Sequence, residues 1–199
     1  MRSANLFVVI LVSYIGSSPL WANSSVDTLI YIDKITYYKQ YATAHDFKGD
    51  TVDYYVRKGI ELSISAMDTV SLIDFYTILG EIEQNKHQYT KALEAYRMAQ
   101  GMISPYRQKE MYANLCRKIG ALHWKYNNYN EAARFFNDAL FYYKHLGMAV
   151  EVGKTYNNLG TISKELSKSD SALYYYEIAI KIFTEIKNQE WLASTYNLI

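Results

Sequence analysis

The residues from Ala113 to Ala139 read ANLCRKIGALHWKYNNYNEAARFFNDA, and the small residues among them decide the fold. Gly120 lies midway between two counterparts, Gly80 and Gly160, and each of these glycines lies among apolar residues at helical spacing. Glycine inside a helix costs about 1 kcal/mol relative to alanine. Because the chain repeats this cost at a fixed period, the glycines indicate a packing requirement, and they predict a helical repeat array.

Other positions keep the same 40-residue period. An alanine recurs at two fixed distances after each glycine, and an aromatic residue recurs at a fixed place between the two alanines. Small side chains let two helices approach closely, and large side chains fill the space beside them. We therefore expect an all-α fold of antiparallel helix pairs that stack on one another. The repeated positions are Ala92, Ala132, Ala172, Tyr96, Phe136, Tyr176, Ala99, Ala139 and Ala179.

Short polar breaks separate the expected helices, which should be about 14 to 20 residues long. Thr90, Asn130 and Asp170 lie at equivalent places after three of these breaks. Their side-chain oxygens can accept a free backbone N–H, so we expect them to be the N-caps of the second helix of each pair.

The pattern resembles the tetratricopeptide repeat (TPR), a family with small residues where its two helices cross and large residues beside them. The resemblance implies a TPR-like right-handed superhelix of antiparallel helix pairs, an α–α solenoid. The proline that usually ends the second helix is replaced by Ser104, Lys144 and Thr184, so we expect longer second helices. Full repeats are expected at 73–106, 113–146 and 153–186, a degenerate N-terminal repeat at 31–67, and the start of a truncated further repeat at 193–199.

The N-terminus is typical of a secretory signal peptide. A basic residue, Arg2, precedes an apolar stretch at 6–15, and Ala22 offers a cleavage site. We expect a signal peptide at 1–22, a linker at 23–30, and a protein exported to the periplasmic or extracytoplasmic side of the membrane. An uncleaved membrane anchor remains the alternative.

Composition argues against several function classes. The formal net charge is +1, which gives no support for nucleic acid as a partner of this segment. We expect membrane attachment only through an uncleaved anchor or a missing C-terminal segment. The four histidines lack metal-ligand spacing, and Cys116, the single cysteine, is expected to be a small buried hydrophobe. The sequence therefore predicts no enzyme, no cofactor and no metal site.

The TPR resemblance implies a ligand groove along the first helices of the pairs. The side chains expected to face this groove are mostly polar, with Trp124 as an aromatic anchor. An ordinary solvated helix face is the alternative, in which Trp124 only packs against a neighbouring helix. The expected groove residues are Asp74, Thr77, Glu81, Asn114, Arg117, Trp124, Lys154, Asn157, Thr161 and Lys164.

With its TPR-like repeats and its export signal, this chain resembles the extracytoplasmic sensor regions of bacterial signalling proteins. We therefore expect a non-enzymatic protein–protein interaction module that binds a protein or peptide as the sensor or adaptor part of a longer protein. The residues 196–199 echo the start of a further repeat, so the sequence predicts a truncated array. Two alternatives stay open, namely a free-standing scaffold for envelope assembly and a regulator of a partner enzyme.

Overall fold

The computed structural model describes residues 24–43 and 50–199, and within these ranges the chain is helical with no strand. The expected signal peptide at 1–22 lies outside the described residues. The helices are α2 (Ser24–Thr43), α3 (Asp50–Ser65), α4 (Thr69–Asn85), α5 (Tyr89–Met102), α6 (Lys109–Lys125), α7 (Tyr129–His145), α8 (Ala149–Glu165), α9 (Ser169–Glu185) and α10 (Gln189–Tyr196).

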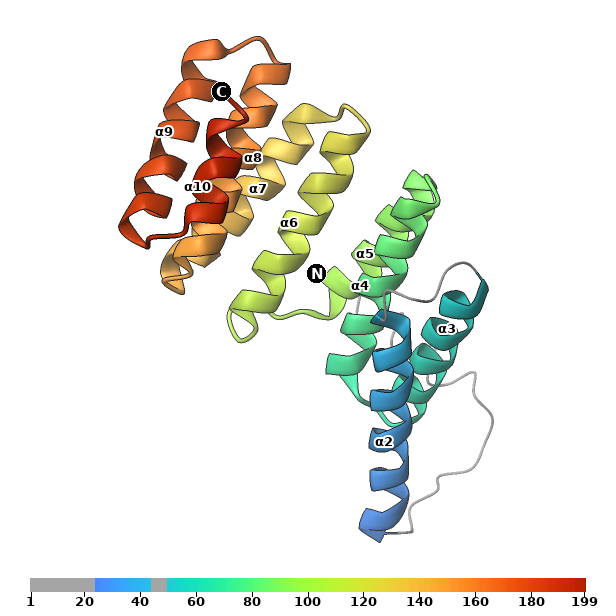
Figure 1. Cartoon of the computed structure of the whole chain (residues 1–199). Coiled ribbons are helices and arrows are strands. Elements are labelled where there is room, and N and C mark those ends of the chain that lie inside the picture. Colours follow the sequence, from blue (N-terminus) through green and yellow to red (C-terminus); the bar gives the residue numbers. More distant parts are fainter. Residues whose placement is uncertain (1–23, 44–49) are drawn as a thin grey trace. The chain divides into compact units, whose positions relative to one another are not determined.

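The chain divides into two compact units, Met1–Met102 and Ile103–Ile199. The first unit contains α2 to α5, and the second contains α6 to α10. Inside each unit every helix packs against the next helix along the chain, and the helices from α3 to α5 and from α6 to α10 follow one another as antiparallel neighbours joined by short turns (Figure 1). The prediction of an all-α fold built from stacked helix pairs is confirmed.

The helices begin at a strict interval. From α4 onward the first residues are evenly spaced, at Thr69, Tyr89, Lys109, Tyr129, Ala149, Ser169 and Gln189. Helices α7 and α9 are the second helices of their pairs, and each has 17 residues, a length that fits the 40-residue period. The expectation of longer second helices is therefore confirmed for these two pairs. The expectation is wrong for α5, which has 14 residues and ends at Met102. Pro105 explains the early end, because its ring would clash with the helical carbonyl four residues before it.

Six helix ends in the described part of the chain share one turn geometry. In the turn after α6, the Asn128 N–H donates to the His123 carbonyl at 2.9 Å, and the Asn127 N–H donates to the Trp124 carbonyl at 3.0 Å. These two bonds define a Schellman motif, which needs a left-handed residue after the C-cap. The left-handed residues are Met67, His87, Asn127, Gly147, Ser167 and Lys187.

This turn geometry corrects the expected N-caps. The first intrahelical bonds of α5, α7 and α9 are accepted by the carbonyls of residues 88, 128 and 168, at 2.9, 3.0 and 2.9 Å. Thr90, Asn130 and Asp170 therefore lie inside the first turn of their helices and are not N-caps. The Schellman turn leaves a single residue between its left-handed position and the next helix, so each helix begins earlier than the capping side chains suggested.

The helix crossings are close where the sequence predicted them. A Cβ atom built on Gly80 would lie 2.4 Å from the Tyr96 ring, and one on Gly160 would lie 2.5 Å from the Tyr176 ring. At Gly120 the nearest ring atom of Phe136 would be 3.1 Å away. Each glycine is helical and leaves space to the aromatic ring of its partner helix, and this space is tighter at Gly80 and Gly160 than at Gly120.

The first helix of the N-terminal unit begins earlier than expected. Helix α2 starts at Ser24, so residues 24–30 of the expected linker at 23–30 are helical instead. Ile35 of α2 is buried with Val56 of α3 and Phe75 of α4, which form the core of this part of the unit. Ala42 of α2 belongs to the same core, whereas Tyr31, Ile32 and Tyr37 of this helix are exposed.

Candidate functional site: a groove over helix α4

The three expected groove residues of the N-terminal unit lie on α4 and are half-buried. Asp74 forms an ion pair with Lys39 of α2. The Thr77 hydroxyl donates to the Ile73 carbonyl at 2.8 Å, which is a bond within the helix. Glu81 lies one turn further along the same helix.

On α6 two of the expected groove residues contact other helices, and the third is partly exposed to solvent. The Tyr143 hydroxyl donates to Asn114 Oδ1 at 2.7 Å, and Arg117 Nε lies 3.7 Å from a carboxylate oxygen of Glu151 on α8. Trp124 is 41% exposed. Arg117 therefore links the first helices of two neighbouring pairs, whereas Trp124 presents part of its ring to solvent.

On α8 two of the expected residues contact α10, one contacts α9, and one contacts Leu198 beyond the end of α10. Asn157 is only 5% exposed, and its amide donates to the Thr195 hydroxyl at 2.8 Å. Lys154 Nζ lies 4.6 Å from the centre of the Trp191 ring. Thr161 accepts from Tyr176 at 3.3 Å, and Lys164 donates to the Leu198 carbonyl at 2.9 Å. Asp74, Arg117, Lys154 and Asn157 thus connect first helices to one another. The ligand-binding role of the ten residues stays a prediction.

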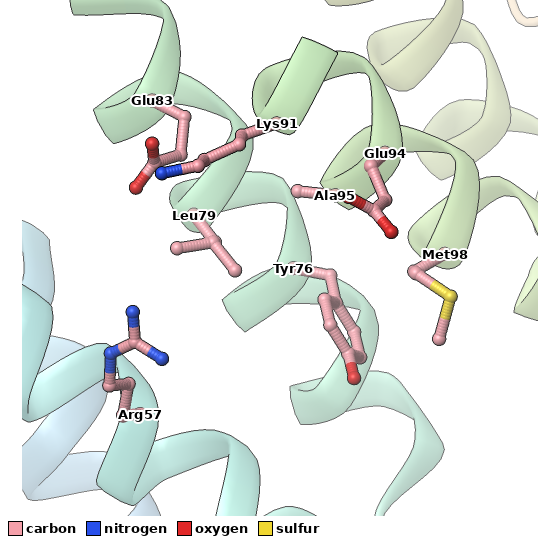
Figure 2. Close-up of a pocket in the computed structure, with 8 residues that line it drawn as sticks. All are labelled: Arg57, Tyr76, Leu79, Glu83, Lys91, Glu94, Ala95 and Met98. Carbon is pink, nitrogen blue, oxygen red and sulfur yellow. The ribbon is translucent and has the colours of Figure 1, made fainter. Parts of the chain in front are cut away.

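A groove that sequence reasoning missed lies on the opposite side of α4, between α3 and α5 (Figure 2). It consists of two adjoining hollows of about 320 Å³ and about 530 Å³ that share Arg57, Tyr76 and Leu79. The first hollow is also lined by Glu83, Lys91, Glu94, Ala95 and Met98, and the second by Ile60, Glu61, Ile64 and Ser65.

The floor of the groove belongs to α4, and its walls belong to the two second helices. Tyr76 and Leu79 lie one turn apart and face the same side of α4, as Figure 2 shows, with Met98 of α5 beside Tyr76. Burial raises the pKa of Tyr76, so its phenol stays neutral at physiological pH. The Tyr76 hydroxyl has no hydrogen-bond partner within the described ranges, so it can donate to a bound group.

The charges around the groove fall into two sets. Glu83 is only 7% exposed, and its carboxylate lies 3.6 Å from Lys86 Nζ. Lys86 also bonds to Asp53 of α3, which raises the pKa of Lys86 and ties α3 to α4. In the second hollow, Lys58 neutralises Glu61 at 2.7 Å.

Three further charged groups at the groove are free. Arg57, Lys91 and Glu94 are exposed and form no ion pair among residues 31–43 and 51–199. The groove therefore combines an apolar floor with unpaired charges of both signs at its edge.

The repeat register held a signal for this groove. In the 40-residue register of the repeats, Ala95 corresponds to Tyr55, Phe135 and Tyr175. A small residue at a place that is otherwise aromatic leaves space, and that contrast is visible in the amino-acid sequence alone.

Other kinds of site find no support in the part of the chain that the structure covers. It has no cluster of three or more His, Cys, Asp or Glu side chains suited to a metal ion. No helix among the described residues is long and apolar enough to cross a membrane. Cys116 is buried, and burial raises its pKa to about 12, so the thiol is held in its unreactive protonated form.

Comparison with known proteins shows the fold. No family model matches the chain, and no curated protein matches it. A solved structure of a Signal Transduction ATPase with Numerous Domains (STAND) protein with a tetratricopeptide repeat sensor, from Pyrococcus horikoshii, is similar with a TM-score of 0.69 and 18% identity. The structure of BtubC (BKLC) from P. vanneervenii is similar with a TM-score of 0.59 and 19% identity.

Each similarity covers 88% of this chain, but only 27% of the STAND protein and 64% of BtubC. The chain thus spans less than two thirds of either protein. At these identities the similarity establishes the architecture alone, a stack of helix pairs of the kind found in a TPR-containing sensor protein.

Proposed function

We propose that this chain is a TPR-type protein-interaction module that binds a peptide as the sensor or adaptor part of a longer bacterial signalling protein. The observation that carries the proposal is the groove over α4, which has an apolar floor and unpaired charges at its edge. Specific recognition needs both elements, since apolar contact supplies affinity and fixed polar groups supply orientation.

The architecture supports the same proposal. Stacked helix pairs offer long surfaces on which successive helices hold side chains at regular spacing, and such surfaces suit an extended or helical peptide. The similarity to a STAND protein with a TPR sensor adds support for a sensory role.

Selection of binding peptides tests this function. A phage library of random dodecapeptides would be panned against the full chain, with a designed helical bundle of similar size as the control target. We expect peptides that are enriched only on this chain and that bind in solution by fluorescence anisotropy. If the two targets enrich the same peptides to the same level, the proposed function is wrong.

Export is the second part of the proposal, and it rests on residues 1–22. Fused to alkaline phosphatase without its own leader, these residues should produce active enzyme, because that enzyme needs the disulfides that form outside the cytoplasm. The N-terminal sequence of the exported chain should begin at Asn23. An inactive fusion would contradict export, and an intact N-terminus in the membrane fraction would show the uncleaved anchor instead.

A further inference from the structure

The aromatic residues that correspond to Ala95 show what the groove lacks. Tyr55, Phe135 and Tyr175 each lie in the second helix of a pair, at the place that Ala95 occupies in α5. The α2–α3, α6–α7 and α8–α9 pairs therefore have an aromatic ring where the α4–α5 pair has a methyl group.

Each of these rings covers the first helix of its own pair. The Tyr55 ring stacks on Tyr41 of α2 with the ring centres 5.1 Å apart. The Phe135 ring lies parallel to the buried His123 of α6, with the centres 5.5 Å apart. An aromatic ring at this place thus shields the side chains of the first helix from water.

The C-terminal pair shows the same contact next to the residue that matches the groove floor. The Tyr175 ring lies 6.1 Å from the ring of Tyr156 on α8. Tyr156 corresponds to Tyr76, the floor residue of the groove, two repeats earlier. Lys144 of α7 also lies over the Tyr156 ring, at 5.0 Å from its centre.

In the α4–α5 pair Ala95 has only a methyl group, and it lines the same hollow as Tyr76. The hollow of about 320 Å³ lies at this place, between Tyr76, Leu79 and Met98. Met98 is 36% exposed at its edge, and a thioether makes favourable contacts with the edge of an aromatic ring. The lining of the hollow is thus suited to one aromatic side chain.

We infer that this hollow binds an aromatic side chain of a peptide from another protein, with an acidic residue of the peptide next to the ring. The inference rests on the proposed function and names the chemistry of its ligand. The ring takes the place that Tyr175 fills over Tyr156, in contact with Tyr76, Leu79 and Met98.

The acidic residue follows from charge complementarity. Lys86 and Lys58 neutralise Glu83 and Glu61, whereas Arg57 and Lys91 face the groove without a carboxylate partner in the described part of the chain. Arg57 comes from α3, across the groove from α5 (Figure 2). A peptide carboxylate at the α3 wall pairs with Arg57 and stays away from Glu94, which lies on α5.

Three synthetic peptides test the chemistry against the full chain. The first has tyrosine between two aspartates within a Gly/Ser sequence, the second has leucine in place of the tyrosine, and the third has lysines in place of the aspartates. The readout is the ¹³C-methyl NMR spectrum of the methionines, because Met98 lines the hollow while Met111 and Met148 belong to the other unit.

We expect the tyrosine–aspartate peptide to shift the Met98 signal through the ring current and to leave Met111 and Met148 unchanged. The leucine peptide should bind about tenfold more weakly, since an aromatic pair adds this much beyond apolar area. The lysine peptide should also bind more weakly. Equal binding of the tyrosine and leucine peptides, or a Met98 signal that does not move, would overturn the inference.

Ala95→Tyr is the decisive variant, because it fills the hollow with the ring that the other pairs already have. We expect it to remove the Met98 shift while its urea midpoint stays at or above that of the parent chain. Tyr175→Ala, the reverse change in the other unit, should leave the Met98 shift intact. Loss of peptide binding in Tyr175→Ala but not in Ala95→Tyr would contradict the assignment.

Arg57→Glu keeps the test decisive if Ala95→Tyr does not fold, because Arg57 is exposed. This variant should abolish the preference for the aspartate peptide over the lysine peptide. Arg97→Glu is the matched control, since Arg97 is the exposed counterpart of Arg57 on α5 and does not line the groove. An equal effect of both variants would show that net charge, rather than Arg57, sets the preference.

The outcomes separate this inference from the proposed function. Library-selected peptides that bind the chain but leave Met98 unshifted would overturn the inference and leave the proposed function standing. A Met98 shift that depends on protein concentration without any peptide would show that a second copy of the chain occupies the hollow, and this also overturns the inference.

Discussion

At the scale of single residues, the periodic glycines leave space for an aromatic ring of the partner helix, and their backbone conformation does not require glycine. None of the three has a positive φ, and each lies against an aromatic ring of the partner helix. The room differs between them, since a Cβ atom would lie 2.5 Å from the ring at Gly160 but 3.1 Å from the ring at Gly120.

This difference predicts opposite results for the same substitution. Gly160→Ala should destabilise its unit by about 1–2 kcal/mol, because the ring of the buried Tyr176 must move. Gly120→Ala should be neutral or stabilising by up to about 1 kcal/mol, since a small shift of Phe136 makes room and alanine favours the helix. Urea unfolding of the two variants measures this, and equal losses would show that the crossing distances are wrong.

Cys116 offers a second test at this scale. Burial raises its pKa from the ordinary 9.0 to about 12. The folded state therefore keeps its proton to higher pH than the unfolded state, and stability should fall as the pH rises from about 9 to about 12. Native chain at pH 8 should react with a disulfide reagent only as fast as it opens. Labelling at the rate of the urea-unfolded chain would contradict the burial.

At the scale of helices, the turns carry strain that the sequence pattern does not reveal. Of the six left-handed turn positions in the described chain, two have residues that this conformation favours, Gly147 and Asn127, and the other four are Met67, His87, Ser167 and Lys187. A left-handed backbone costs about 1 kcal/mol or more for residues with a side chain. The turns that set the regular spacing of the helices thus form despite the conformational free-energy cost of their left-handed residues.

Glycine at such a position should stabilise the protein. Ser167→Gly is expected to raise stability by about 1 kcal/mol, and Gly147→Ala should lower it by about the same amount. Ser171→Gly is the matched control, because Ser171 is exposed and helical in α9, where glycine costs about 0.5 kcal/mol. Thermal and urea unfolding check the signs. A loss of stability in Ser167→Gly would show that the Schellman turn does not form there.

At the scale of the whole molecule, the chain consists of two units that meet in sequence at residues 102 and 103. Pro105 lies just beyond this boundary and ends α5 three residues short of the 17-residue length found in α7. The early end of α5 thus coincides with the division between the units, although α6 begins at the regular interval.

The division predicts that residues 103–199 fold without the N-terminal unit. Stacked helix pairs are stabilised mainly by their nearest neighbours, and α6 to α10 pack on one another within this range. The isolated segment should show a mainly helical circular dichroism spectrum and one cooperative urea transition. A helical spectrum without a cooperative transition would mean that the segment needs the other unit.

The sequence by itself determined the repeated part of the structure. A fixed 40-residue period of glycine, alanine and aromatic residues is a local pattern that recurs, and close crossing of paired helices is the arrangement that accommodates it. The helix pairs, the contacts of Gly80, Gly120 and Gly160, and the burial of Cys116 could be predicted for this reason.

Only the tertiary structure decided what depends on contacts between repeats. Asn157 has the sequence position of a groove residue, yet its amide bonds to Thr195 on α10, 38 residues later. The smaller hollow of the groove over α4 lies where Ala95 has no ring, and the groove also needs α3 and α5 on either side of α4. A periodic pattern specifies which faces pack, whereas the space between packed faces depends on side chains from three helices at once.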